Sequence, residues 1–464
     1  MGTLDKVKGL VENPPKEYRS APFWGWNDRL QKENLGEQIE GFKKAGMGGF
    51  FIHSREGLET EYLSTEWMQD VKFCVDKARE NDLELWIYDE DKWPSGAAGG
   101  KVSRVNPAEF TARALTMECG KAGELAVPAK LSNEEERTVT GDSDSIMCGG
   151  NRSTDENFMS GRNGSEDLAV EETMETEFLQ GVYVIQTAAD GRFIKRMKEY
   201  LTYEEAAEAC GVDEEILLLR QEISGKSEWY NGLMPPDNLN PESVKTFLKL
   251  THEHYEEVFG GSFPKEVKGF FTDEPNCCDF FSVFHEGRPW IPWSIGFTEY
   301  FIEKRGYDPQ EKLPYLFFDG EGAEKIRHDY WKTVAQRFEE SYMKQVYEWC
   351  DKRGLRTTGH ILYENDLGYQ TRVCGAAMPQ LRYLHNPGID LLGAQTDEYL
   401  TVKQCASVAH QYDRSMTISE AYGCTGWELD FSTQKWLGDW QFALGITRRC
   451  QHLALYSITG CRKR

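Results

Sequence analysis

Residues 270–275 read FFTDEP and residues 417–423 read TISEAYG; each stretch is an apolar run that ends in an acidic residue and a turn. An apolar run of this length indicates a buried β-strand, and Pro275 ends the first one because proline lacks a backbone donor. In a parallel barrel, the carboxyl ends of all strands meet at one rim, where active sites lie. The two stretches therefore predict that Glu274 and Glu420 lie at the same rim.

The alternation of apolar runs, turns and amphipathic stretches recurs along the chain, as expected for β/α units around a parallel sheet. It predicts eight strands, at about 20–27, 48–53, 83–89, 267–273, 355–362, 388–393, 416–420 and 452–459. It predicts helices at 32–45, 64–81, 241–259, 323–353, 402–412 and 433–449. The sequence thus indicates an α/β fold, a (β/α)8 barrel of the TIM type, with a β-rich insertion between strands 3 and 4.

The insertion divides the chain into three predicted parts. Residues 1–105 supply barrel strands 1–3, residues 106–230 form the inserted β-rich module, and residues 231–464 supply strands 4–8. Within the module, residues 133–177 are rich in Ser, Gly, Asn and acidic residues, which indicates a flexible acidic loop. Because the chain ends at its eighth strand, we expect a fragment that lacks a final helix and C-terminal β domains.

Composition narrows the classes of partner. The formal net charge of −24 disfavours nucleic acid and anionic membranes, which would be repelled. No run of about 18 apolar residues is present, and the first residues lack the apolar core of a secretory signal. We therefore expect a cytoplasmic protein with a neutral or cationic ligand; the sequence does not predict the oligomeric state.

Paired carboxylates at one rim indicate a specific chemistry. Hydrolysis of a glycosidic bond needs one carboxyl group to protonate the leaving oxygen and another to activate water or attack the sugar. The sequence therefore predicts a glycoside hydrolase with a carbohydrate substrate. Asp273 is expected to orient Glu274 or to contact the sugar, and Phe270, Phe271, Phe280 and Phe281 would raise the pKa of Glu274, as a general acid requires. The alternatives are that Glu274 caps a helix and that Glu420 pairs with Arg372 or Arg414.

Further candidates are expected to bind sugar hydroxyls or to stack on a sugar ring. They are Trp26, His53, Asp89, Glu90, Asp91, Trp93, His360, Glu364, Tyr422 and Trp427. Three of these assignments leave a second role open. Trp26 packs equally well in a core, Glu364 is a rival for the second carboxylate, and the acidic loop at 89–91 offers the oxygen ligands that calcium prefers.

Several sequence blocks in a fixed order resemble one known family. They are PFWGWND (22–28), GMGGFFIHSREGL (46–58), IYDEDKWPSGAAGG (87–100), FFTDEP (270–275), TTGHIL (357–362), SEAYGCTGW (419–427) and LALYSITGCRKR (453–464). Together they resemble the barrel domain of glycoside hydrolase family 106, known chiefly as α-L-rhamnosidases. The resemblance implies an inverting mechanism, with Glu274 as general acid and Glu420 as general base. It also implies a calcium ion near the sugar and β-rich domains after the barrel.

Two other functions remain open from the sequence. The first is a non-catalytic carbohydrate-binding barrel or a truncated, inactive enzyme. The second is a metal-dependent hydrolase of the amidohydrolase type. That chemistry needs paired histidines at the end of strand one, where this chain has Asn27 and Asp28.

Overall fold

The structure is a computed structural model that describes residues 3–125, 176–277 and 287–462. Almost all of the predicted acidic loop at 133–177, and both Phe280 and Phe281, lie outside the described residues.

The chain divides into two compact units. Unit 1 comprises Met1–Val105, Glu228–Cys277 and Val334–Arg464, and unit 2 comprises Asn106–Ser227 and Cys278–Thr333. The sequence analysis had grouped residues 278–333 with the barrel, whereas the structure groups them with the insertion.

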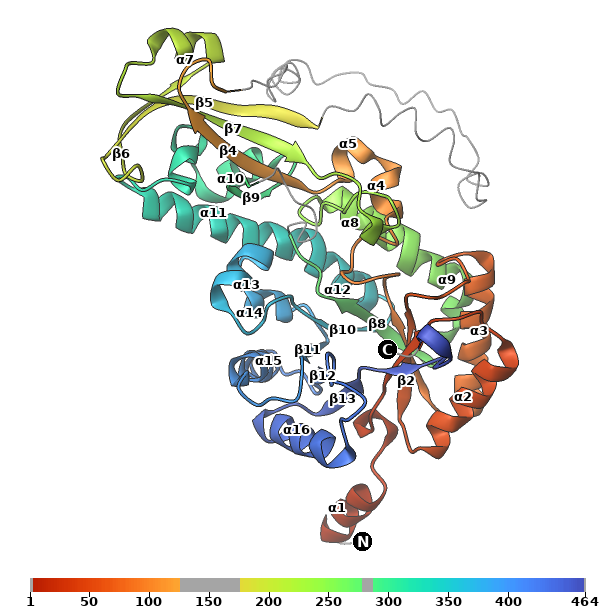
Figure 1. The fold of residues 1–464 in the computed structure, drawn as a ribbon. Helices are drawn as coiled ribbons and strands as arrows, with labels where there is room; N and C mark the ends of the chain where they lie inside the picture. Colours follow the sequence, from red (N-terminus) through yellow and green to blue (C-terminus); the bar gives the residue numbers. More distant parts are fainter. Residues whose placement is uncertain (1–2, 126–175, 278–286, 463–464) are drawn as a thin grey trace. The chain divides into compact units, whose positions relative to one another are not determined.

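Unit 1 is a parallel β-barrel surrounded by helices (Figure 1). Its strands are β1 (Phe23–Trp26), β2 (Gly49–Ser54), β3 (Glu84–Tyr88), β8 (Val267–Asp273), β10 (Arg356–His360), β11 (Asn386–Leu391), β12 (Ile418–Ala421), β13 (Arg448–Gln451) and β14 (Ala454–Leu455). They pair in the order β13-β12-β11-β10-β8-β3-β2-β1-β14, and every pair is parallel. The predicted α/β barrel with an inserted module is therefore confirmed.

The eighth barrel strand is divided, and its predicted position was wrong. It begins at Arg448 instead of residue 452, and His452 and Leu453 interrupt it. Its first half, β13, pairs with β12, and its second half, β14, pairs with β1 and closes the barrel. The sequence RRCQ of β13 is polar, so it lacks the apolar run by which the other strands were recognised.

The helices cover the barrel at nearly the predicted positions. In unit 1 they include α2 (Lys32–Lys44), α3 (Thr65–Glu80), α8 (Pro241–Leu248), α9 (His254–Phe259), α12 (Lys344–Asp351), α13 (Leu367–Cys374), α14 (Ala377–Leu381), α15 (Tyr399–Gln411) and α16 (Phe431–Leu444). The Ser64 side chain caps α3 by accepting a hydrogen bond from the Trp67 amide. Gly445, with a φ of 119°, ends α16 earlier than predicted.

Strand residues alternate between the barrel interior and the helix layer. Phe23, Phe51 and Phe271 pack together inside the barrel. Trp26 contacts Trp67 of α3, at 5.0 Å between ring centroids, and is fully buried. Trp26 therefore belongs to the layer between strand and helix, which is the packing role that the sequence had left open.

Unit 2 is built on an antiparallel sheet. Its strands are β4 (Arg113–Gly120), β5 (Glu177–Thr187), β6 (Ile194–Tyr200), β7 (Glu215–Ile223) and β9 (Trp290–Trp293), in the order β6-β5-β7-β4-β9. One face packs Val182, Ile216 and Leu218 against Ala206 of α7 (Tyr203–Ala209). Unit 2 also holds α10 (Phe297–Arg305) and most of α11 (Ala323–Phe338). In the described parts of both units, no helix combines the length and apolar character needed to cross a membrane.

A buried ion pair joins two strands at the amino end of the barrel. Arg448, at the start of β13, donates to Glu84, at the start of β3, over 2.7 Å, and both side chains are buried. We expect Arg448→Met to lower the free energy of unfolding by about 3–5 kcal/mol, because it leaves Glu84 buried and unpaired. The double variant Glu84→Gln/Arg448→Met should recover much of that loss.

Urea unfolding of the three proteins checks this expectation. Lys245→Met serves as the control, since its pair with Glu242 is exposed and should contribute less than about 1 kcal/mol. An Arg448→Met variant as stable as the control would show that the buried pair does not stabilise the barrel.

Candidate active site

The predicted rim residues come from neighbouring strands. In the register of the sheet, Asp273 at the end of β8 lies beside His360 at the end of β10. Asp390 of β11 lies beside Glu420 of β12. Glu274 follows β8 directly. The parallel pairing thus gathers acidic side chains and one histidine at the carboxyl ends of four strands.

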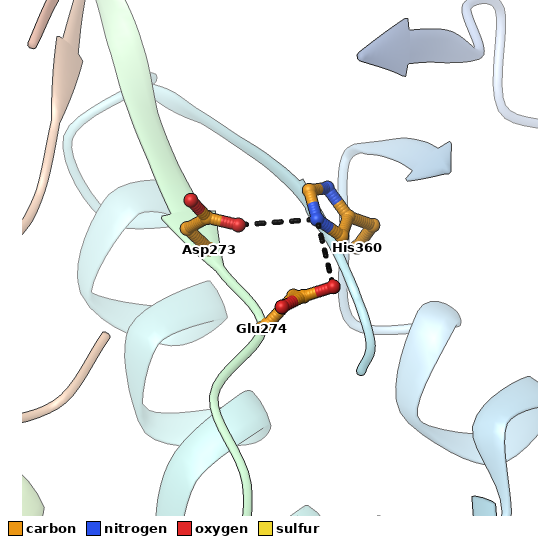
Figure 2. A group of neighbouring side chains, drawn as sticks. All are labelled: Asp273, Glu274 and His360. Carbon is orange, nitrogen blue, oxygen red and sulfur yellow. Dashed lines mark ion pairs between the residues drawn. The ribbon is translucent and has the colours of Figure 1, made fainter. Parts of the chain in front are cut away.

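His360 stands between the two predicted catalytic carboxylates. Its Nε2 lies 3.1 Å from Asp273 Oδ1 and 3.7 Å from Glu274 Oε1. Figure 2 shows both carboxylates turned toward this nitrogen. Its Nδ1 lies 3.9 Å from Glu420 Oε2. Glu274 and Glu420 therefore approach opposite nitrogens of one imidazole ring, so the structure brings the two predicted carboxylates to one site.

The charges around His360 favour its protonated form. Burial alone would lower the pKa of this histidine, because the interior disfavours a cation. Asp273, Glu274 and Glu420 outweigh burial and raise the pKa well above its ordinary value of 6.5. An imidazolium is therefore the central positive charge of the site near neutral pH.

Three buried carboxyl groups near His360, those of Glu420, Asp390 and Glu364, have raised pKa values. Burial raises the pKa of Glu420 well above 4.5, and the charges of Asp390 and Asp273 raise it further. Burial raises the pKa of Asp390 to about 7 and that of Glu364 to about 8, while the charge of His360 opposes both shifts. Near neutral pH these three carboxyl groups therefore retain protons.

Asp390 is a site residue that the sequence analysis missed. Its Oδ1 is buried and lacks a hydrogen-bond partner among the described residues. The available signal was the acid inside the apolar stretch GIDLLG at 388–393. Two strands must first be placed in register before that acid is seen to face Glu420.

The backbone of Glu274 is strained, and its side chain is held by a hydrogen bond. Its φ of 46° lies in the left-handed region, which non-glycine residues rarely adopt and which is common at functional sites. Trp93 donates its indole N–H to Glu274 Oε2. Next to it, the Tyr88 hydroxyl donates to Asp273 over 2.5 Å. The positions of Asp273 and Glu274 are thus fixed by aromatic donors from the β3 strand and its loop.

The acidic loop after β3 is built around its own carboxylates. Glu90 accepts backbone N–H groups from Asp91, Gly96, Ala97, Ala98 and Gly99. Asp89 accepts the Ser95 hydroxyl over 2.6 Å. Asp91 accepts donors from Ser54 and Asn231. These carboxylates hold the loop in place, and their sugar contacts stay predictions.

Calcium does not fit the described acidic groups well. Both oxygens of Glu90 and both of Asp91 accept protein donors, as does Asp89 Oδ1, whereas Asp89 Oδ2 is buried without a hydrogen-bond partner among the described residues. Among the described residues, Asp273, Glu274 and His360 form a group whose possible ligand atoms all lie within 4.8 Å of one another. Calcium prefers a shell of six to eight oxygens, whereas an imidazole nitrogen suits transition ions such as zinc. Calcium binding stays a prediction, and no step below depends on it.

Glu364, the predicted rival for the second carboxylate, and His53, a predicted sugar-binding residue, lie close to the same site. Glu364 accepts the Asp390 amide over 2.9 Å and is buried. His53 is buried and stacks on Tyr88, with ring centroids 3.8 Å apart. Glu364 thus contacts the backbone of Asp390 and His53 contacts Tyr88, and direct contact of either residue with a sugar stays a prediction.

A cavity of about 430 Å³ lies at the end of β12 and β13, and its lining does not include Asp273, Glu274, Glu364, Asp390 or Glu420. His452 lines this cavity, and its Nε2 lies 4.0 Å from Glu420 Oε1. The predicted residues Tyr422 and Trp427 line it as well, and 63% of Trp427 is exposed. Such a volume suits a small ligand.

Comparison with known proteins supports the fold. A scan against protein-family models finds no match, and no curated protein matches the sequence. Among solved structures, the chain is similar to a rhamnosidase from Novosphingobium sp. PP1Y, with a TM-score of 0.63 and 14% sequence identity. The similarity covers 98% of this chain and 57% of that rhamnosidase, so this chain spans little more than half of its length. The protein therefore has a rhamnosidase-like fold.

Buried Glu364 provides a test of the electrostatics of the site. With a pKa near 8, it keeps its proton in the folded state while the unfolded chain loses it near pH 4.5. Its contribution to stability therefore falls as the pH rises from about 4.5 to about 8. Glu364→Gln has no proton to lose, so its free energy of unfolding should not carry this pH-dependent loss. We expect the difference between variant and unaltered protein to shift in favour of the variant by a few kcal/mol from pH 4.5 to pH 8, at about 1.4 kcal/mol per pKa unit.

Urea unfolding at pH 5 and pH 8 measures the effect. Glu37→Gln is the matched control, because Glu37 is exposed on α2 and its stability difference should not vary with pH. A difference for Glu364→Gln that is equally independent of pH would contradict the buried, proton-retaining carboxyl group.

Proposed function

We propose that this protein is a glycoside hydrolase of the family 106 type, an inverting α-L-rhamnosidase that removes a terminal sugar from a glycoside or polysaccharide. The observation that carries the proposal is the placement of Glu274 and Glu420 on opposite nitrogens of His360. The rhamnosidase-like fold and the resemblance of the sequence blocks support it. The cavity lined by His452, whose Nε2 lies 4.0 Å from Glu420, has the volume for a sugar.

The two carboxylates divide the work of hydrolysis. One protonates the oxygen of the leaving group, and the other removes a proton from the attacking water. Inversion needs the carboxyl groups about 6.5–9.5 Å apart, to leave room for that water, whereas retention needs about 5–5.5 Å. Because Glu274 and Glu420 contact opposite nitrogens of one imidazole ring, we expect the larger of these separations.

His360 has a positioning role in this proposal. Its positive charge favours the ionised form of whichever carboxylate must accept a proton. The same charge limits the repulsion among Asp273, Glu274 and Glu420, which would otherwise disfavour their joint ionisation. The buried Tyr88 hydroxyl and the partly buried Trp93 indole donate to Asp273 and Glu274 and orient both carboxylates.

Replacing either carboxylate by its amide tests the proposal. We expect Glu420→Gln to lower kcat/KM for an aryl α-L-rhamnoside by about 10²–10⁴-fold, the range for loss of a general acid or base, and Glu274→Gln to lower it by less, because an aryl leaving group needs little protonation. Release of nitrophenol gives the rate, and proton NMR of the first product gives its anomeric form. Glu37→Gln is the control for the same substitution at an exposed site.

Full activity in both amide variants would remove the pair from the mechanism. Absence of hydrolysis by the unaltered, folded protein, combined with sugar binding measured by calorimetry, would favour the carbohydrate-binding alternative. Zinc that copurifies with the protein and is required for activity would favour the amidohydrolase alternative.

The roles within the pair need a separate test. The resemblance assigns the acid to Glu274 and the base to Glu420, whereas the raised pKa of Glu420 in the unliganded site suits an acid. A nitrophenolate leaving group needs little protonation, so the variant that lacks the acid should lose less activity on nitrophenyl rhamnoside than on a disaccharide. We expect Glu274→Gln to show this difference and Glu420→Gln to lose activity equally on both. The reverse pattern would exchange the two roles.

A further inference from the structure

Two tryptophans continue the chain of contacts that joins Glu420, His360 and Glu274. Glu274 Oε1 lies 3.7 Å from one nitrogen of His360, and Glu420 lies near the other nitrogen. The second oxygen of Glu274, Oε2, accepts the indole N–H of Trp93. Trp229 packs edge-to-face on Trp93, with ring centroids 5.7 Å apart and an interplanar angle of 89°. The contacts therefore lead from Glu420 through His360 and Glu274 to the tryptophan pair.

Trp229 is held in place by the loop that follows β3. It lies in the short turn η3 (Glu228–Tyr230), and its indole N–H donates to the Trp93 carbonyl. Asn231, the residue after this turn, donates to the Asp91 carboxylate over 2.9 Å. The Trp229 ring is thus fixed relative to the loop that orients Glu274, while 39% of the residue remains exposed.

The tryptophan pair lies on the side of Glu274 where a leaving group would depart. In an inverting hydrolase, the base and its water act on one face of the sugar, and the acid protonates a leaving group on the opposite face. Glu274, the proposed acid, faces His360 and Glu420 with one oxygen and Trp93 with the other. A leaving group that departs away from Glu420 therefore moves toward the tryptophan pair.

An exposed and immobile indole at this place suits a ring-shaped group. A single exposed aromatic residue is common on protein surfaces and is not a site by itself. Trp229 differs because its contacts connect it to a candidate catalytic carboxylate. The flat, apolar face of an indole can stack on the C–H face of a pyranose, and a fixed ring loses little entropy when it does so.

We propose that Trp229 is the platform on which the leaving sugar of the substrate stacks. The inference rests on the proposed glycosidase function and adds to it a class of leaving group, a pyranose ring, and a residue that selects it. The competing explanation is that Trp229 only supports Trp93 and, through it, Glu274. The two explanations differ in whether the effect of Trp229 depends on the leaving group.

Substrates with and without a ring in the leaving group test this inference. We measure kcat/KM for methyl α-L-rhamnoside and for the rhamnosyl disaccharide that the unaltered protein cleaves fastest. The ratio of the disaccharide value to the methyl value is then compared between variants, so that the inherent reactivity of the two bonds cancels. In Trp229→Ala we expect this ratio to fall by about 5- to 20-fold, as for the loss of one aromatic contact.

Two further variants serve as controls. Trp229→Phe keeps an aromatic ring without the indole N–H, and it should retain most of the ratio. Trp436→Ala removes a half-exposed tryptophan from α16, outside the candidate site, and should leave the ratio unchanged. A Trp229→Ala variant that loses the same factor on both substrates would overturn the inference, because it would show that Trp229 only supports Glu274.

The inference can also be tested if neither glycoside is hydrolysed by the folded protein. That result would remove the proposed function, and binding would then decide the inference. Calorimetric titration with rhamnosyl glucose and with methyl α-L-rhamnoside should show tighter binding of the disaccharide. Trp229→Ala should lose this difference, and Trp436→Ala should keep it. Equal affinity for the two ligands, or no binding of either, would overturn the inference.

Discussion

Five carboxyl groups converge on one buried imidazole at the rim of this barrel, and the arrangement of the site depends on that convergence. Parallel pairing of β8, β10, β11 and β12 brings Asp273, His360, Asp390 and Glu420 to the same rim of the barrel. In a low dielectric these acids cannot all be ionised together. The charge of His360 and the protons retained by Glu364, Asp390 and Glu420 resolve the conflict. A proton-sharing site is therefore a consequence of strand register.

The backbone at the rim is held in conformations that an isolated peptide would avoid. Glu274 and Tyr422, which follow two of the converging strands, both have positive φ angles. Gly359, which precedes His360, has a φ of 140°, and a Cβ there would come within 1.9 Å of the Thr272 carbonyl oxygen. The folded barrel must supply the energy for these conformations. Side chains on such a backbone are pre-organised, which suits groups that must meet a substrate in fixed positions.

Much of the barrel was predictable because its strands are buried on both faces. Runs such as FFTDEP show this burial directly, and the acids that end them mark the rim. The first half of the eighth strand was missed because it contains a charged residue, Arg448, in a buried position. Arg448 is paired there with Glu84, a residue far away in sequence, and a local sequence pattern cannot show this partner. The sequence also does not show that residues 278–333 belong to unit 2. Their strand β9 pairs with β4 of the same unit, and the two strands are distant in sequence.

The sequence predicts most residues of the candidate site, but it predicts less of what each residue does there. The sequence identifies Glu90 as an acid at the rim, but only the structure shows that five backbone N–H groups donate hydrogen bonds to its carboxylate. Asp390 needs the register of β11 with β12 to be recognised. The balance of protons among the carboxylates depends on burial and on mutual distances, which are properties of the folded chain.

Closure of the barrel by β14 also determines when the site comes into existence. Trp24 of β1 pairs with Ala454, so the seam joins the beginning of the barrel to its last residues. The loop that must be closed is almost the entire chain, and contacts this distant in sequence form slowly. During synthesis, β1 and β12 therefore expose unpaired edges until Arg448–Leu455 has been made. Gln451, His452 and Leu455 of that segment line the cavity, so the cavity is complete only after the last strand has been added to the barrel.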